Sequence, residues 1–201
     1  MSDILIVDDF LGQSDLENIQ NNLSDEMFPW NYVGNVSGIK TITDVPSDLN
    51  ISPEIFYFIN DVYIFSHGQI KHFHKPLMEL LDCILIKLYI RALIRIKINM
   101  YTKTEVPYFH GYHCDANGPN SKVVYLTSQV DHNYNDDNDE PYTDSKTAIF
   151  YVDTNNGQTD IDGERVDSVE NRIIIFPNNI RHSSITQTDT NRRIVINFNY
   201  F

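Results

Sequence analysis

The chain of 201 residues is long enough for one domain with a substantial core. Its formal net charge of −13 disfavours non-specific binding to nucleic acid, which requires a cationic surface. No apolar run approaches the ~20 residues that span a bilayer, and the acidic start does not resemble a signal peptide. The two cysteines have no metal-binding spacing and are typical of reduced thiols. We therefore expect a cytoplasmic protein that binds neither nucleic acid nor membrane.

The N-terminal part predicts a short strand at residues 3–10 and then a helix. Ser14 has the character of an N-cap, and Glu17 three residues later completes a capping-box pattern. The apolar face of this helix is formed by Leu16, Ile19 and Leu23.

The next part of the chain contains the longest predicted helix, at residues 69–89 with an interruption near Pro76. Its apolar stripe consists of Leu77, Leu80, Leu81, Ile84, Leu85 and Leu88. Before it, residues 53–65 alternate aromatic and aliphatic side chains, and their pattern does not distinguish a helix from a strand.

The second half of the chain predicts short strands separated by Gly and Asn turns. Residues 94–101 have a period of two, which is typical of a half-buried strand. A turn at 155–157 predicts that residues 158–161 pair back onto the preceding strand, and Asp162-Gly163 predicts a second turn. The remaining strands are expected at residues 145–152, 172–176 and 193–201. Many strands and few helices favour a β-sandwich or barrel backed by helices.

Residues 116–144 form the least regular region, with an acidic, Asn-rich run from Asp131 to Asp144. A short strand at residues 123–126 is the only regular element expected there. A loop of this length inside a compact domain is usually functional or disordered.

The segment His113-Cys114-Asp115 carries the chemistry. Residues two apart in an extended segment point to the same side, so the imidazole and the carboxylate can reach one metal ion. His182, which follows an apolar strand and a turn, is the candidate third ligand. Two His and one carboxylate with open positions form the facial triad of non-haem Fe(II) oxygenases. The spacing alone is equally compatible with exposed turn residues, and His110 is interpreted as a structural or pocket-lining residue on the opposite face.

With these residues in place, the chain resembles the Fe(II)/2-oxoglutarate-dependent oxygenases, and within them the prolyl-4-hydroxylase-like group. It is especially similar to small oxygenases encoded by marine bacteriophages. The motifs that carry the resemblance are Asn99-Met100-Tyr101, His113-x-Asp115, residues 146–159, residues 168–172, His182 and residues 193–201. The family fold is a double-stranded β-helix, or jelly roll, with supporting helices. The resemblance implies one domain, 1–201, in which residues 1–92 are mostly helical support and flanking strands and residues 93–201 form the catalytic core with the loop 116–144.

The resemblance also implies roles for particular residues. The iron ligands would be His113, Asp115 and His182. A basic residue after the distal His would pair with the C5 carboxylate of 2-oxoglutarate; Arg192 and Arg193 are both candidates, and Arg193 is preferred because it directly precedes the apolar strand. The expected hydrogen-bond donors to the co-substrate are Tyr101 and Tyr151, although each is almost as well explained as a core aromatic residue.

The activity implied by this resemblance is hydroxylation of a C–H bond with Fe(II), 2-oxoglutarate and dioxygen, releasing succinate and CO2, with ascorbate as an optional addition. Asp115 favours hydroxylation, since related halogenases have a small residue in place of the carboxylate. A prolyl residue in a peptide or protein is the preferred substrate. A free amino acid or another small molecule is the alternative, and a jelly-roll binding module without turnover belongs to another class. If the chain is encoded by a phage, the expected location is the host cytoplasm.

Overall fold

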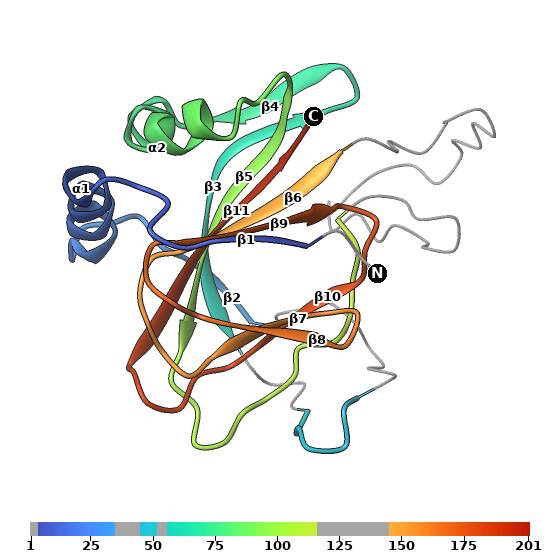
Figure 1. Ribbon diagram of the computed structural model, residues 1–201. Coiled ribbons are helices and arrows are strands. Elements are labelled where there is room, and N and C mark those ends of the chain that lie inside the picture. Colours follow the sequence, from blue (N-terminus) through green and yellow to red (C-terminus); the bar gives the residue numbers. More distant parts are fainter. Residues whose placement is uncertain (1–3, 35–44, 52–55, 116–144) are drawn as a thin grey trace.

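The computed structural model describes residues 4–34, 45–51, 56–115 and 145–201, and it shows two antiparallel β-sheets that face each other (Figure 1). Two helices, α1 (Gln13–Ser24) and α2 (Lys75–Lys87), pack on the outer side of the larger sheet. The predicted class, mainly β with supporting helices, is confirmed. Within the described residues, neither helix is long and apolar enough to cross a membrane.

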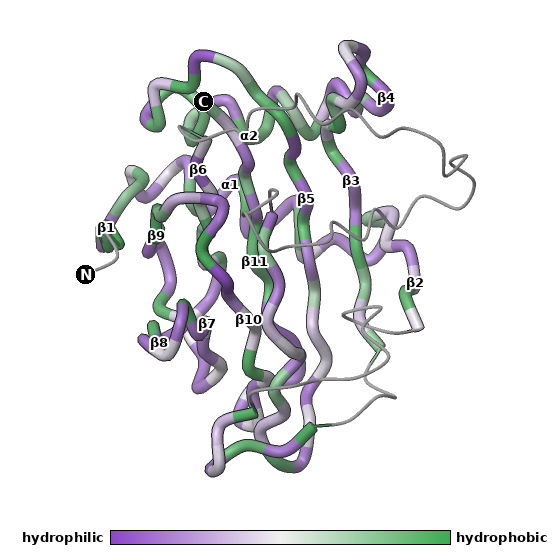
Figure 2. Tube along the Cα trace, turned by 90° about the vertical axis from the view of Figure 1, so that its right-hand side faces the viewer, coloured by the Kyte–Doolittle hydropathy of each residue, from purple (hydrophilic) through white to green (hydrophobic). Residues whose placement is uncertain are grey.

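The larger sheet has eight strands in the order β1-β9-β6-β11-β5-β3-β2, with β4 paired to β3 (Figure 2). The smaller sheet has the order β10-β7-β8. The strand bounds are β1 (Leu5–Val7), β2 (Asn31–Val33), β3 (Tyr57–Ser66), β4 (Gln69–Phe73), β5 (Leu93–Thr102), β6 (Lys146–Tyr151), β7 (Gln158–Ile161), β8 (Glu164–Asp167), β9 (Arg172–Pro177), β10 (His182–Ile185) and β11 (Arg192–Tyr200).

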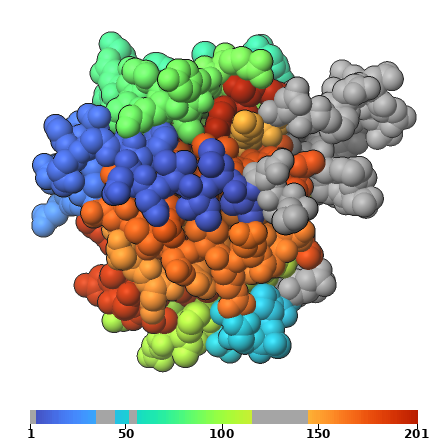
Figure 3. All heavy atoms as spheres, in the orientation of Figure 1, coloured from blue at the N-terminus to red at the C-terminus, as the bar shows by residue number. Residues whose placement is uncertain are grey.

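The outer face of the larger sheet forms a hydrophobic core with the two helices. Alternate residues of β11 (Ile194, Ile196 and Phe198) point into this core, because side chains in a strand alternate between faces. The helices contribute Leu16, Ile19, Leu23, Leu77, Leu81 and Ile84. In the space-filling view the N-terminal segment with α1 (blue) lies directly beside α2 (green) (Figure 3).

The inner face of the larger sheet forms a second core with the smaller sheet. Its buried members include Ile149, Tyr151, Ile161, Val166, Ile174, Phe176 and Val195. This inner face also carries polar side chains, since Arg193, Asn197 and Asn199 lie on the same side of β11 as Val195. The fold therefore places a set of polar groups between two hydrophobic layers.

The strand predicted at residues 94–101 is present as β5, but it is not half-buried. Its second face is covered as well, with Asn99 only 2% and Tyr101 only 7% exposed. Tyr101 belongs to the core that the larger sheet forms with the smaller sheet, whereas Arg95, near the other end of β5, keeps 35% of its side-chain surface exposed.

The helix predicted at residues 69–89 is wrong in its first part. His67 and Gly68 both have positive φ angles, of 51° and 70°, and form a tight turn that pairs β4 with β3. The helix α2 begins only at Lys75, where the His74 side chain accepts a hydrogen bond from the Leu77 backbone N–H. Pro76 therefore lies in the first turn of the helix, where proline is tolerated, and does not interrupt it.

Two further expectations are corrected by the structure. The helix α1 starts at Gln13 with Gly12 as its N-cap, so Ser14 is not the cap, and Glu17 accepts a hydrogen bond from the Gln13 side chain. The strand β7 does not pair with β6. It crosses to the smaller sheet and pairs with β8 and β10, whereas the Asp162-Gly163 turn between β7 and β8 is confirmed. The strand expected at residues 123–126 and the loop 116–144 lie outside the described residues.

Candidate metal centre and co-substrate pocket

The segment from Phe109 to Asp115 runs antiparallel to β10 and extends the smaller sheet. Phe109 bridges Ile185, and His113 bridges His182. In the second bridge the His113 N–H donates to the His182 carbonyl over 3.0 Å, and the His182 N–H donates to the His113 carbonyl over 2.8 Å. Backbone pairing thus holds two histidines from distant parts of the chain opposite each other.

The three predicted ligands come together at this bridge. One donor atom from each of His113, Asp115 and His182 lies within 4.8 Å of the others. His182 Nε2 is 3.6 Å from Asp115 Oδ2, and the two imidazole rings have centroids 4.4 Å apart. Two imidazoles and one carboxylate that converge from one side leave the opposite positions of an ion open.

The donor set fits a resident metal ion. His182 is 2% exposed, and its Nε2 has no hydrogen-bond partner among the described residues. Its other nitrogen, Nδ1, lies 3.1 Å from the Ile180 carbonyl, which favours a proton on Nδ1 and a free lone pair on Nε2. A buried nitrogen without a partner is unusual in a folded protein, and a metal ion would satisfy it.

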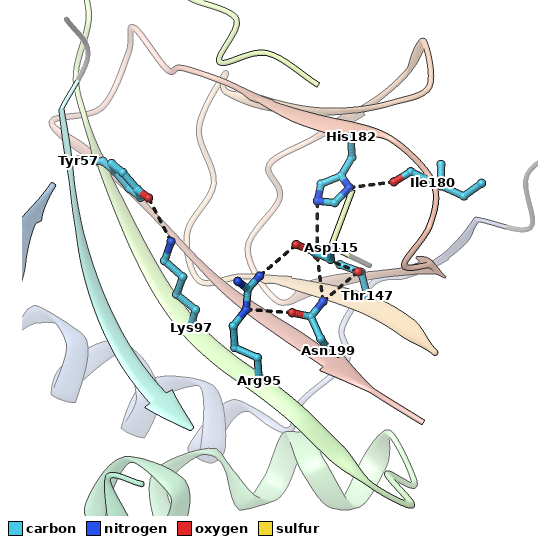
Figure 4. A network of polar contacts seen from close by, with 8 residues as sticks. All are labelled: Tyr57, Arg95, Lys97, Asp115, Thr147, Ile180, His182 and Asn199. Carbon is cyan, nitrogen blue, oxygen red and sulfur yellow. Dashed lines mark hydrogen bonds and ion pairs between the residues drawn. The ribbon is translucent and has the colours of Figure 1, made fainter. Parts of the chain in front are cut away.

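Three side chains that the sequence did not single out hold the carboxylate of Asp115 (Figure 4). Arg95 donates to Oδ1 over 3.0 Å, and Thr147 and Asn199 each donate to Oδ2 over 2.9 Å. Arg95 also donates to the Asn199 side-chain oxygen over 3.0 Å, so the group forms one connected network. Since the three residues come from β5, β6 and β11, only the assembled sheet brings them to Asp115.

This network keeps Asp115 ionised. Burial opposes the charge of the carboxylate, but His182, Arg95 and His113 together with the Asn199 hydrogen bond outweigh it, and the pKa of Asp115 lies well below its usual value. Nearby protein atoms and then the adjacent His182 lower the pKa of His113, although His113 itself is an exposed residue. A charged carboxylate and a neutral imidazole are the forms that bind a divalent cation.

Arg193 lies on β11 with its guanidinium buried between the sheets, and it is 1% exposed. Its three nitrogens donate to hydroxyl groups: Nε to Ser168 over 2.9 Å, one terminal nitrogen to Ser184 over 2.5 Å and the other to Thr159 over 3.2 Å. The guanidinium also lies 5.5 Å from the centre of the Tyr101 ring and 5.7 Å from that of Tyr151. Hydroxyls and aromatic rings therefore orient the charge without neutralising it.

Within the described part of the chain, no carboxylate lies within ion-pair distance of Arg193. Burial lowers the pKa of Arg193, while the two tyrosines and Asp153 partly restore it. A buried charge without a counter-ion is costly, and a bound carboxylate would relieve that cost. Arg192 points the other way, since it is exposed and donates to the Ser24 hydroxyl over 2.6 Å.

The strand β10 connects the surroundings of Arg193 to the three candidate metal ligands. His182 and Ser184, the partner of Arg193, are two residues apart on this strand and point to the same face. Two residues along a strand correspond to about 6.6 Å. A five-carbon dicarboxylate can bridge such a separation, with one end at the triad and the other at the guanidinium.

The two predicted tyrosines border the arginine, but neither is confirmed as a co-substrate contact. Tyr151 donates its hydroxyl to Thr159 over 2.8 Å, and Tyr101 stacks on Tyr57 with ring centroids 5.6 Å apart. The His110 ring lies 5.2 Å from Tyr101 and is 5% exposed. The strand-phase argument for placing His110 on the opposite face does not hold, because Gly111 has a φ of 89° and interrupts the regular alternation.

No family model and no curated protein matches the sequence. The fold does match solved structures. An oxidoreductase of the 2OG-Fe(II) oxygenase family from Burkholderia pseudomallei superposes with a TM-score of 0.57 at 13% identity, covering 98% of this chain and 84% of the other. A prolyl hydroxylase from Trichoplax adhaerens, in complex with a peptide of hypoxia inducible factor, has a TM-score of 0.55 at 15% identity and covers 100% and 84%.

A third solved structure, HygX from Streptomyces hygroscopicus with nickel and 2-oxoglutarate bound, has a TM-score of 0.51 at 12% identity and covers 99% and 82%. The protein therefore has the jelly-roll fold of the 2-oxoglutarate/Fe(II) oxygenases. A further structure with this fold is described as a carbocyclase, at 9% identity, so the fold alone does not determine substrate or reaction outcome.

Proposed function

We propose that this protein is an Fe(II)- and 2-oxoglutarate-dependent dioxygenase that hydroxylates a C–H bond and releases succinate and CO2. The observation that carries the proposal is that two buried groups in one fold lack a matching partner among the described residues. In the part of the chain that the structure describes, the buried His182 Nε2 has no hydrogen-bond partner beside a converging imidazole and carboxylate, and the buried Arg193 has no acid within ion-pair distance. Iron would satisfy the first and the C5 carboxylate of 2-oxoglutarate the second.

In this proposal each residue has a definite task. His113, Asp115 and His182 hold the metal, which supplies the oxidising chemistry when dioxygen is present. Arg193 binds the C5 carboxylate of 2-oxoglutarate, and Tyr101 and Tyr151 border that carboxylate and exclude water from it.

The proposed substrate is a prolyl residue in a peptide or protein, supported by the structural likeness to a prolyl hydroxylase that holds a peptide. A free amino acid or another small molecule is the second candidate, because HygX has the same fold and is described with hygromycin B bound. Screening proline-rich peptides and free amino acids for a mass gain of one oxygen atom separates the two candidates.

The test of the reaction class is the formation of succinate. Purified protein is mixed anaerobically with Fe(II) and 2-oxoglutarate, oxygen is admitted, and succinate is measured with and without peptide. We expect wild-type turnover and its loss in His182→Ala, while His72→Ala, a change at an exposed histidine on β4, serves as the matched control. Absence of succinate from both uncoupled and peptide-stimulated turnover of the wild-type protein would favour a binding module over the enzyme.

A second pair of variants tests the co-substrate site. Arg193→Ala removes the buried cation and is expected to raise the KM for 2-oxoglutarate. Arg192→Ala removes an exposed cation one residue away and is expected to leave that KM unchanged. A larger defect in Arg192→Ala would contradict the assignment.

A further inference from the structure

The inner face of β5 carries two cations, Arg95 and Lys97. The charge of Lys97 has no role in the proposed metal and co-substrate sites. Arg95, Lys97 and Tyr101 lie on the same face of this strand, because they are separated by even numbers of residues. Arg95 is the residue that contacts Asp115 (Figure 4). Lys97 Nζ donates to the Tyr57 hydroxyl over 3.1 Å and lies 5.1 Å from the centre of that ring. An ammonium has three N–H donors, so this single contact leaves donor capacity free.

The ammonium of Lys97 has no acid partner at ion-pair distance among the residues that the structure describes. Asp61, its register neighbour on β3, and Asp115 act on it only from further away, and the Asp115 carboxylate is already engaged by Arg95. Burial, followed by the nearby Arg95 charge, lowers the pKa of Lys97 to about 8. The fold thus keeps a partly buried positive charge on the inner face of β5 at a cost in stability.

The surroundings of Lys97 are built to hold it in place. Tyr57, which accepts its hydrogen bond, stacks on Tyr101 with an angle of only 10° between the rings. On the other side Asn197 of β11 is directly opposite Lys97, and its side-chain oxygen is buried without a hydrogen-bond donor in the described chain. Neighbours directly opposite in a sheet have Cβ atoms about 5 Å apart. The Asn197 side-chain oxygen is an acceptor, so a ligand that binds Lys97 through a carboxylate would satisfy it only with an N–H or O–H group elsewhere in the ligand.

We propose that Lys97 binds a carboxylate group of the primary substrate. This inference rests on the proposed oxygenase function and specifies its substrate class. Lys97 is two residues from Arg95, about 6.6 Å along the strand, and Arg95 contacts the metal-ligating carboxylate of Asp115. A substrate anchored at Lys97 by its carboxylate would present a nearby C–H bond to the metal.

The chain as a whole carries a net charge of −13, so a cationic group on this inner face of β5 is not a consequence of average composition. Arg193, which donates to the hydroxyl groups of Ser168 and Ser184, already provides a separate carboxylate site. Lys97 is therefore left to bind a second anion. The anion is the free carboxylate of an amino acid, the C-terminus of a peptide, or an acidic side chain next to the oxidised residue. All three sources present a carboxylate group, and the choice of probe distinguishes between them.

The experiment compares matched probes that differ only in one charge. The pairs are L-proline and L-prolinamide, a peptide ending in proline as its free acid and as its amide, and a peptide with Asp or Asn next to proline. Each probe is tested for stimulated succinate formation and for a gain of one oxygen, and its binding is measured by calorimetry with Mn(II) in place of Fe(II). We expect the carboxylate member of one pair to bind and react, and its neutral partner to fail.

Variants then assign the effect to Lys97. Lys97→Met keeps the aliphatic stem and removes the charge, and it should raise the KM of the reactive carboxylate probe roughly tenfold or more, whereas Lys97→Arg should restore most of the loss. Lys71→Met, a change at an exposed lysine of β4, is the matched control.

Three outcomes would overturn the inference. Equal binding of acid and amide in every pair, including no binding of either, removes the carboxylate from recognition. A defect of Lys97→Met in the KM for 2-oxoglutarate would assign Lys97 to the co-substrate. Equal defects in Lys97→Arg and Lys97→Met would show that the charge is not what matters. Wild-type protein that binds a carboxylate probe through Lys97 without forming succinate would refute the proposed reaction alone.

Discussion

The substitution Gly157→Ala tests how closely the co-substrate arginine is packed. A Cβ atom at position 157 would lie 2.8 Å from Arg193 Cδ, 2.8 Å from the Asn155 side-chain oxygen and 3.1 Å from the Ile185 carbonyl. Ordinary contact begins at 3.4 Å, so Arg193 must move by about 0.6 Å or more. The added methyl group cannot easily move instead of Arg193, because the Ile185 carbonyl belongs to the backbone and limits that movement.

The magnitude follows from the bonds that this movement strains. The Arg193 guanidinium donates to three hydroxyls at 2.9, 2.5 and 3.2 Å, and a displacement of this size disrupts at least one of them. Loss of one hydrogen bond of a charged group costs about 1.5–3 kcal/mol, which corresponds to roughly 10- to 100-fold in the affinity for 2-oxoglutarate. Overpacking should also lower the free energy of unfolding by about 1–3 kcal/mol.

The assay is calorimetric titration of 2-oxoglutarate into Mn(II)-loaded protein, together with urea unfolding. The control is Gly34→Ala, because the added methyl group would make only ordinary contacts there, with the Tyr32 side chain at 3.4 Å and beyond. A folded Gly157→Ala variant that binds 2-oxoglutarate as tightly as wild type would refute the reasoning, since Arg193 would then not be the carboxylate partner.

Two further changes test other parts of the site. Thr147→Val removes a 2.9 Å hydrogen bond to Asp115 while nearly keeping the side-chain shape, and Mn(II) affinity should fall roughly tenfold or more; a folded variant with unchanged affinity would contradict the positioning role. Asp153→Asn tests a partly buried carboxylate, because burial raises the pKa of Asp153 to about 6. The folded state then keeps a proton that the unfolded chain releases near pH 4, so stability from this group falls as the pH rises from about 4 to 6. The variant should therefore exceed wild type in unfolding free energy by about 1–2 kcal/mol at pH 7, and this difference should disappear near pH 4. Urea titrations at both pH values measure it. A difference that does not depend on pH would assign the effect to something other than ionisation of Asp153.

The comparison between sequence and structure is most informative at β7. The residues 158–161 were correctly predicted as a strand, and the Asp162-Gly163 turn after them was correctly placed. Their pairing partner was not, because a turn signal indicates that the chain reverses but not that it crosses to another sheet. The helix prediction over 69–73 failed for a related reason, since pairing of β4 with β3 overrides local preference.

The ligand candidates were within reach of sequence reasoning because their signal is local. His113-x-Asp115 is a spacing of two, and Arg193 opens an alternating run in which polar residues share one face. The Asp115 network was missed, because Arg95, Thr147 and Asn199 come from three strands, and no pattern in any one strand indicates a neighbour in another. In β5 the sequence showed the alternation but not that Asn99 and Tyr101 on the polar side are buried.

The sequence by itself determined the class of fold, the set of chemical groups and the faces on which most of them lie, since these follow from spacing and periodicity along the chain. Only the tertiary structure decided which groups meet. The backbone bridge between His113 and His182, the hydroxyl groups around Arg193 and the contact of Lys97 with Tyr57 all depend on segments that are distant in the chain and adjacent in space. The physical reason is that strand partners are chosen by non-local packing, which no local pattern encodes.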